Sequence, residues 1–270
     1  MPAPLTLEPI IEGNPDGETI VFVQGWPDDA SLWDATVAEL REAYRCVRVN
    51  MPNFGPERKR VRWGYSTEEI VDALVALLRK VAGDGKVTLV LHDWGSYWGH
   101  AAHHRAPEVV ARVATLDVAP HFTPKPREWA GLVAYQGLLL SAFYIGGPVG
   151  DALTRGFAKL AKAPQAATVE ATMNYPYRNA WSDIASGRIR TLTKGYFPDC
   201  PLLFVYGEQK PFAFHSERWL AHVRATGGSV VALPCDHWVP RHPTFPTLLA
   251  SWLAEHPEGA TKESAQRARA

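Results

Sequence analysis

The stretch Val87-Thr88-Leu89-Val90-Leu91-His92-Asp93-Trp94-Gly95-Ser96 decides the fold. It begins with a run of apolar and β-branched residues, which is typical of a buried strand. The run stops at an aspartate, and a glycine follows two residues later. A sharp strand-to-helix turn lifts one side chain off the sheet, and a small residue at that distance lets the helix pack closely. The pattern therefore predicts a nucleophile elbow that presents Asp93, with a plain helix-capping aspartate as the alternative.

A carboxylate at such a turn favours a particular chemistry. Serine in this position attacks acyl carbon, whereas a carboxylate attacks sp³ carbon and forms an alkyl ester. Epoxides and alkyl halides suit that attack. The ester must then be hydrolysed, so the site also needs a base, an acid that orients the base, and donors for the developing oxyanion.

The rest of the chain alternates short apolar runs with helical patterns, which predicts a mostly parallel sheet with crossover helices, an α/β fold. Between residues 120 and 198 this rhythm stops. We interpret residues 1–119 and 199–259 as one discontinuous core, residues 120–198 as an inserted helical cap, and residues 260–270 as a flexible tail. The cap should lie over the carboxyl ends of the strands, where such sheets bind ligands. The predicted strands are Thr19–Val23, Cys46–Val49, Val87–Leu91, Val113–Leu116, Leu202–Val205 and Val230–Leu233.

Charge and composition exclude several classes of function. The 28 basic residues balance 28 acidic ones, so no global field attracts nucleic acid or an anionic membrane. The sequence shows neither a signal-like segment nor an apolar run long enough to span a bilayer. The 3 cysteines lack metal-ligand spacing. We expect a cytoplasmic monomer or homodimer with no metal or organic cofactor, no nucleic-acid partner and no stable membrane insertion.

His237 is the candidate base. It lies in Cys235-Asp236-His237-Trp238, directly after the last predicted strand. Nine other histidines compete with it, but only His237 occupies the expected chain order, in which the nucleophile comes first and the base last.

The acid that orients the base can follow either of two strands. Asp117 ends the run Val113–Leu116, while Glu208 lies in Gly207-Glu208-Gln209-Lys210-Pro211 after a later strand. The usual pattern in the later segment is Gly-Glu-x-Asp-Pro, and Lys210 stands here in place of that aspartate. A lysine cannot orient an imidazolium, so we favour Asp117 and retain Glu208 as the alternative acid.

A second strand and turn, Val21-Phe22-Val23-Gln24-Gly25-Trp26-Pro27-Asp28, supplies candidate oxyanion donors. The backbone N–H groups of Trp26 and Trp94 suit this role. A preorganised donor of that kind contributes about 3 kcal/mol to the transition state. The alternative is an ordinary loop between a strand and a helix.

Together, Gly25-Trp26-Pro27, His92-Asp93-Trp94-Gly95 and Cys235-Asp236-His237-Trp238 resemble the epoxide hydrolases of the α/β-hydrolase fold, and the resemblance covers almost the whole chain. It implies that fold and a pair of cap tyrosines that polarise the epoxide. The segments Tyr135-Gln136 and Asn174-Tyr175-Pro176-Tyr177-Arg178-Asn179 resemble those that carry the pair.

The resemblance nominates Tyr135 and Tyr177, with Tyr175 as the alternative to Tyr177. Opening an epoxide creates an alkoxide, and a phenol with a pKa near ~10 can donate a hydrogen bond and then a proton to it. A leaving halide needs no proton.

The chain departs from that family at Gln24, where a histidine is usual, at Leu91, where glycine is common, and at Lys210. An acid after the earlier strand resembles haloalkane and fluoroacetate dehalogenases. Haloalkane dehalogenases hold the halide with the tryptophan after the nucleophile, matched by Trp94, and with a second donor at the turn position where this chain has Trp26.

We therefore expect an epoxide hydrolase that converts a small apolar epoxide and water to a vicinal diol. Asp93 forms the alkyl ester, and His237, oriented by Asp117, activates the water. A haloalkane dehalogenase with the same nucleophile is the first alternative. A catalytically silent relative that binds a small ligand is the alternative from another class.

Overall fold

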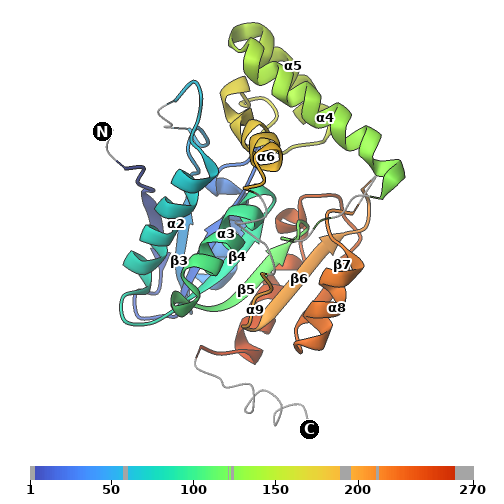
Figure 1. Cartoon of the computed structure of the whole chain (residues 1–270). Helices are drawn as coiled ribbons and strands as arrows, with labels where there is room; N and C mark the ends of the chain where they lie inside the picture. Colours follow the sequence, from blue (N-terminus) through green and yellow to red (C-terminus); the bar gives the residue numbers. More distant parts are fainter. Residues whose placement is uncertain are drawn as a thin grey trace.

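The computed structural model describes residues 4–56, 60–120, 122, 125–188, 196–210 and 213–258. Within these residues, seven strands form one sheet in the order β1-β3-β2-β4-β5-β6-β7 (Figure 1). The strands are β1 (Pro9–Gly13), β2 (Thr19–Val23), β3 (Arg45–Val49), β4 (Val87–His92), β5 (Val110–Leu116), β6 (Leu202–Gly207) and β7 (Ser229–Leu233).

All six predicted strands are confirmed, and neighbouring strands from β3 to β7 pair in parallel. The strand β1 is the exception, because it pairs antiparallel with β3 at the sheet edge. The sequence pattern does not predict β1. Its Ile10 and Ile11 are 38% and 48% exposed, so the strand lacks the buried apolar run by which the others are recognised.

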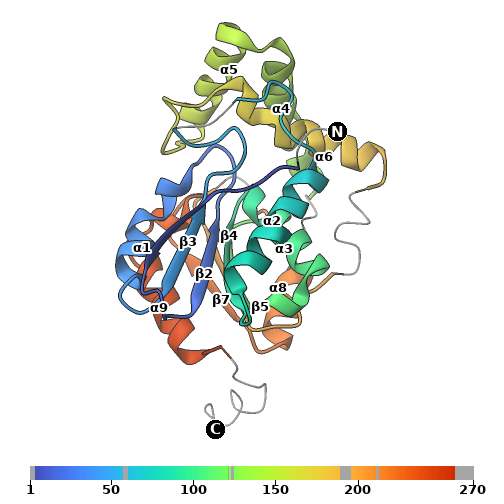
Figure 2. The same cartoon turned by 90° about the vertical axis from the view of Figure 1, so that its left-hand side faces the viewer.

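Helices cover both faces of the sheet (Figure 2). The helices α1 (Asp34–Leu40) and α9 (Phe245–Glu255) pack against each other on one face. The helices α2 (Thr67–Ala82), α3 (Trp94–Arg105) and α8 (Glu217–Ala225) lie on the other. Short 3₁₀ turns join these elements at η1 (Ala30–Trp33), η2 (Pro107–Val109) and η4 (Val239–Arg241). The predicted arrangement, a mostly parallel sheet flanked by helices, is confirmed.

Local sequence explains where α2 begins and which face it buries. Ser66 accepts a hydrogen bond from the Glu69 backbone, and the Glu69 side chain accepts one from the Ser66 backbone, which forms a capping box. Ile70, Leu74 and Leu77 recur at helical spacing and are buried against the core.

A group of helices is inserted between β5 and β6 and lies over the carboxyl ends of the strands (Figure 1). We call these elements the cap helices. They comprise α4 (Pro126–Ile145), α5 (Gly147–Leu160), η3 (Ala171–Asn174) and α6 (Tyr175–Ala185). The helix α4 contacts the other three, so it joins them into one layer. The predicted tail, residues 260–270, lies outside the described residues.

In the described part of the chain, no helix combines the length and apolar character needed to cross a membrane.

Gly95 allows the first turn of α3 to approach β2. A Cβ atom at this position would clash with the carbonyl oxygen of Val23. The elbow and the sheet can therefore meet only because residue 95 has no side chain.

Substituting Gly95 with Ala should lower the free energy of unfolding by about 2 kcal/mol, since the overpacked backbone must shift. Gly156→Ala is the matched control, because Gly156 lies inside α5 and a Cβ there meets nothing within 4 Å. This control should be neutral or slightly stabilising, by up to about 1 kcal/mol. Urea denaturation of the two variants measures both values, and equal stabilities would contradict the packing argument.

Candidate active site

Asp93 stands at the junction of β4 and α3 with φ 54° and ψ −128°. A positive φ is unfavourable for a residue with a Cβ atom and persists only where the surrounding structure imposes it. Here β4 is buried along its whole length, and α3 begins at the next residue. The turn therefore holds the Asp93 carboxylate at the carboxyl edge of the sheet, below the cap helices.

The turn after β2 packs against this elbow. A Cβ atom on Gly25 would clash with both Asp93 Oδ1 and the Trp94 backbone nitrogen. This close approach lets the backbone N–H of Trp26 donate a hydrogen bond to Asp93 Oδ1 at 2.6 Å. The backbone nitrogens of Trp26 and Trp94, the two predicted oxyanion donors, thus both lie beside the Asp93 carboxylate.

His237, in the loop after β7, lies between two carboxylates. Its Nε2 is 3.4 Å from Asp93 Oδ2, and its Nδ1 is 2.7 Å from Asp117 Oδ2.

Burial lowers the pKa of His92 to about 4, so this ring is neutral at pH 7. Its Nε2 lies 3.0 Å from the carbonyl oxygen of His237, where an N–H of the neutral ring can hold the loop in place.

Asp117 follows β5 and is fully buried. Its Oδ1 accepts hydrogen bonds from the Gly207 backbone at 3.1 Å and from the Lys210 ammonium. Burial alone would raise the pKa of Asp117, but the hydrogen bond and charge of His237, together with Lys210, lower it to about 2. Asp117 is therefore ionised at neutral pH.

The charges of the site also control the protonation of His237. Burial alone would lower the pKa of His237, but its hydrogen bonds to Asp117 and Asp93 and their negative charges raise it to about 10. The resting site thus holds an imidazolium between two carboxylates. Any event that neutralises one of those carboxylates makes it easier for His237 to release its proton.

The alternative acid, Glu208, lies elsewhere. Its side chain is exposed, and its backbone N–H donates to the carbonyl oxygen of Leu233 at 3.0 Å. Of the two sequence candidates for the acid, the structure brings Asp117 to His237 and leaves Glu208 at the surface.

The two nominated cap tyrosines lie together. The rings of Tyr135 on α4 and Tyr177 on α6 are perpendicular, with centroids 6.2 Å apart. Tyr177 also lies edge-on to Trp94 at 5.2 Å and to Trp26 at 5.7 Å. Burial raises the pKa of both phenols, and the charge of Asp93 raises it further. Both hydroxyls therefore keep their protons at pH 7 and can act as donors near Asp93.

Tyr175, the alternative cap tyrosine, has a different environment. Its ring stacks on Phe54 at 6.0 Å and on Trp98 at 6.5 Å. Its hydroxyl is buried and has no hydrogen-bond partner among the described residues. These contacts are those of a packing residue in the layer between core and cap.

The indole of Trp26 is tied to the cap. Its N–H donates to Asn174 Oδ1 at 2.8 Å, and the Asn174 amide donates in turn to Leu139 and Thr154. Sequence reasoning did not predict that Asn174 links Trp26 to the cap helices, because an isolated asparagine before a helix is most often interpreted as a helix cap.

Sequence reasoning also missed Asp28 as a buried acid. Its Oδ2 accepts a hydrogen bond from the Trp238 indole at 2.8 Å, and burial raises its pKa to about 7. Its charge acts on His237 and Asp93, so Asp28 belongs to the electrostatic environment of the site. Its position directly after Trp26-Pro27 is the one signal that could have indicated this role.

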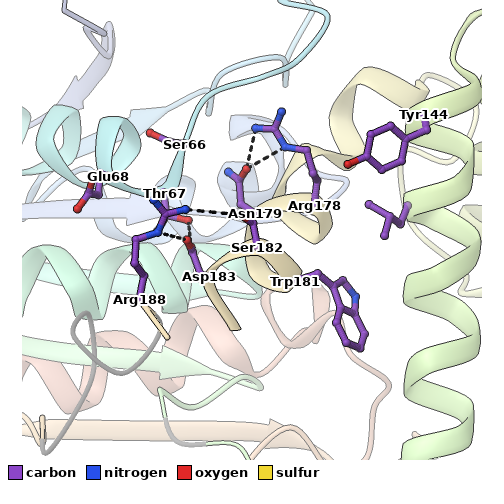
Figure 3. A pocket seen from close by; sticks show the side chains of 11 residues that line it. Ser66, Thr67, Glu68, Tyr144, Arg178, Asn179, Trp181, Ser182, Asp183 and Arg188 are labelled. Carbon is purple, nitrogen blue, oxygen red and sulfur yellow. Dashed lines mark hydrogen bonds and ion pairs between the residues drawn. The ribbon is translucent and has the colours of Figure 1, made fainter. Parts of the chain in front are cut away.

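A cavity of about 460 Å³ opens at the surface between the start of α2 and the helices α4 and α6 (Figure 3). In its wall, Asp183 pairs with Arg188 and accepts a hydrogen bond from Thr67. Asp93 and His237 do not line this cavity, so it is distinct from the site described above.

Comparison with known proteins places this geometry in a family. Residues 18–239 match the family model described as alpha/beta hydrolase fold. Over 131 residues the chain is 31% identical to a cis-3-alkyl-4-alkyloxetan-2-one decarboxylase from Xanthomonas campestris pv. campestris, a match that covers 44% of this chain and 42% of that protein. The matched segments span between 18% and 46% of the length of the curated relatives.

Two solved structures share the fold. A loop variant of a haloalkane dehalogenase from Bradyrhizobium elkanii aligns with a TM-score of 0.69 and 16% identity, over 100% of this chain and 98% of that one. An epoxide hydrolase from Vigna radiata aligns with a TM-score of 0.67 and 19% identity, over 92% of this chain and 94% of that one. The identities are too low to transfer an activity, but the fold and the family match agree. The chain belongs to the alpha/beta hydrolase fold family.

Proposed function

We propose that this protein is an epoxide hydrolase that forms a covalent alkyl ester on Asp93. The observation that carries the proposal is the pair of protonated phenols near the Asp93 carboxylate, of which Tyr177 is buried and Tyr135 is half-buried. Tyr135 and Tyr177 belong to different cap helices, yet both lie close enough to Asp93 for its charge to raise their pKa values. Two donors beside a carboxylate suit a substrate whose leaving group is an alkoxide that stays attached to the product.

The first step uses the oxygen of Asp93 that is not held by the backbone. Oδ1 accepts the Trp26 N–H, so Oδ2 is the oxygen that attacks the epoxide carbon. The carbon–oxygen bond of the ring breaks as the ester forms. The ring oxygen takes a hydrogen bond and then a proton from a phenol, which leaves a hydroxyalkyl ester and a tyrosinate.

The second step depends on the charge lost in the first. An ester at Asp93 no longer stabilises the imidazolium of His237, so the pKa of His237 falls. The imidazolium gives its proton to the tyrosinate, which restores the phenol, and the neutral ring can then take a proton from water. The resulting hydroxide attacks the ester carbonyl, and the oxyanion develops on Oδ1, which faces the Trp26 N–H. Collapse releases the diol and restores the Asp93 carboxylate. The hydrogen of the attacking hydroxide passes to the leaving alkoxide, and His237 keeps the proton taken from water, which restores the resting imidazolium.

Haloalkane dehalogenation is the rival for the same nucleophile, since a halide could leave without a proton. A dehalogenase of the resembling type needs a second halide donor at the position of Trp26. The indole N–H of Trp26 instead donates to Asn174 Oδ1. This arrangement leaves a departing halide without that donor, which favours an epoxide over a halide.

Replacing both Tyr135 and Tyr177 with Phe should lower the rate of epoxide opening at least about 10²-fold, the lower end of what general acid catalysis contributes. Diol formation from styrene oxide measures the effect. Tyr175→Phe is the matched control and should keep the wild-type rate, because it removes a hydroxyl with no partner among the described residues.

The same variants should be assayed for halide release from 1-bromobutane and for turnover of a 3,4-dialkyl oxetan-2-one, the ring named in the decarboxylase relative. Wild-type turnover of either compound in preference to every epoxide tested would overturn the proposed function. So would full epoxide activity in the double variant. A wild-type protein that turns over none of them would favour the ligand-binding alternative.

Asp117→Asn should slow hydrolysis of the ester by on the order of 10⁴-fold, because the base loses the group that fixes its orientation and stabilises its charge. Glu208→Gln removes the rival acid and should leave the rate close to wild type. Rapid-quench measurement of diol release under single-turnover conditions gives the rate of ester hydrolysis in each variant. A larger loss in Glu208→Gln than in Asp117→Asn would contradict the assignment.

A further inference from the structure

Lys210 has an unusual position for a lysine. Its side chain is only 7% exposed, and its ammonium contacts Oδ1 of the fully buried Asp117. The ammonium also lies 5.5 Å from the centre of the Phe214 ring. Burying a lysine is costly unless its charge is paired. The pairing here is with the acid that orients the candidate base.

Three ionisable groups lie close to Lys210, and Asp117 is the one among them that is charged at pH 7. Burial lowers the pKa of Lys210, while Asp117 opposes that effect. His215 also faces Lys210, and burial lowers the pKa of that ring to about 4. Cys235 is close as well, and burial raises the pKa of its thiol to about 11. Both of these groups are neutral at pH 7.

Several ionisable groups surround His237. Asp93 and Asp117 are its two hydrogen-bonded carboxylates. His92 contacts it from β4 as a neutral ring, and Asp28 acts on it from the turn after β2. Beside it in the loop, the Asp236 carboxylate accepts the backbone N–H of Trp238 at 3.0 Å. Lys210 supplies a positive charge at Oδ1 of Asp117, whereas the imidazole is bonded to Oδ2.

Esterification of Asp93 creates a difficulty that this arrangement can solve. Once Asp93 is an ester, Asp117 is the carboxylate still bonded to the imidazole. A buried carboxylate bonded to an imidazolium forms a strong pair and opposes release of the proton. Hydrolysis nevertheless needs a neutral ring to accept a proton from water.

We propose that Lys210 is a positioning residue that balances the charge of Asp117, so that His237 can release its proton and act as a base once Asp93 has been esterified. This inference rests on the proposed function, because the ester is its premise. Lys210 contacts neither substrate nor His237 in this role and acts through Oδ1 of Asp117. Lys210 stands in the segment after β6 at a position where an aspartate is usual. In this role it balances the charge of Asp117, the acid that follows β5.

The test uses Asp93→Asn, whose neutral amide imitates the charge of the ester without any substrate. In this background the pKa of His237 is measured by NMR titration of protein with isotope-labelled histidine, and the resonance is assigned with His237→Gln. Adding Lys210→Met should raise the pKa of His237 by about one unit or more, since a nearby charge typically shifts a pKa by 1–3 units.

Two further substitutions separate charge from packing. Lys210→Gln retains a hydrogen-bond donor without the charge and should cause the same upward shift, which keeps the test valid if the methionine variant does not fold. Lys210→Arg retains the charge and should restore the value of the lysine protein. Lys80→Met is the matched control, because it removes an exposed charge at the end of α2, where the strands begin, and should leave the pKa of His237 unchanged.

An unchanged or lower pKa of His237 in both neutral variants would overturn the role of Lys210, whether or not the protein opens epoxides. In the protein with Asp93 intact, Lys210→Gln should also move the acid limb of the pH–rate profile for ester hydrolysis to higher pH. If the NMR shift is found but no epoxide is opened, the proposed function fails while the effect of Lys210 on His237 stands.

Discussion

The positive φ of Asp93 is the constraint on which the site depends. An aspartate adopts this backbone conformation only when its surroundings enforce it, and two glycines make that possible. Gly95 lets α3 meet the end of β2, and Gly25 lets the neighbouring turn touch the elbow. The same contacts bring the Trp26 N–H to one carboxylate oxygen and leave the other beside His237. The strained backbone, the close packing and the presentation of the proposed nucleophile therefore depend on the same contacts.

Charge balance then determines what the site can do at each stage. In the resting site, the His237 imidazolium lies between the Asp93 and Asp117 carboxylates. In the proposed mechanism, esterification removes one negative charge, which converts the charged ring into a base. In that mechanism, the buried cation at Lys210, which contacts Asp117, would limit how strongly Asp117 holds the imidazolium proton. The cap contributes groups of another kind, neutral phenols whose pKa values are raised by desolvation.

The sequence allows prediction of features that depend on local patterns. Apolar runs predict the buried strands, and a strand followed by an aspartate and a glycine predicts the elbow. Their order along the chain brings His237 and Asp117 to one sheet edge, as parallel strands require. The edge strand β1 escapes this reasoning because half-exposed residues form it. The roles of Asp28, Asn174 and Lys210 also escape it, since burial and distant partners determine them. From the sequence alone, Lys210 is notable only because it occupies a position where an aspartate is usual.

The most direct test of the covalent mechanism is intact-protein mass spectrometry of the His237→Gln variant after incubation with styrene oxide. Removing the base should block hydrolysis but not attack, so a stable adduct should accumulate whose added mass equals that of the intact epoxide. Peptide mapping should locate it on Asp93. The wild-type protein under the same conditions should turn over without accumulating the adduct. Continued diol formation by the variant with no adduct, or an adduct on another residue, would contradict covalent catalysis by Asp93.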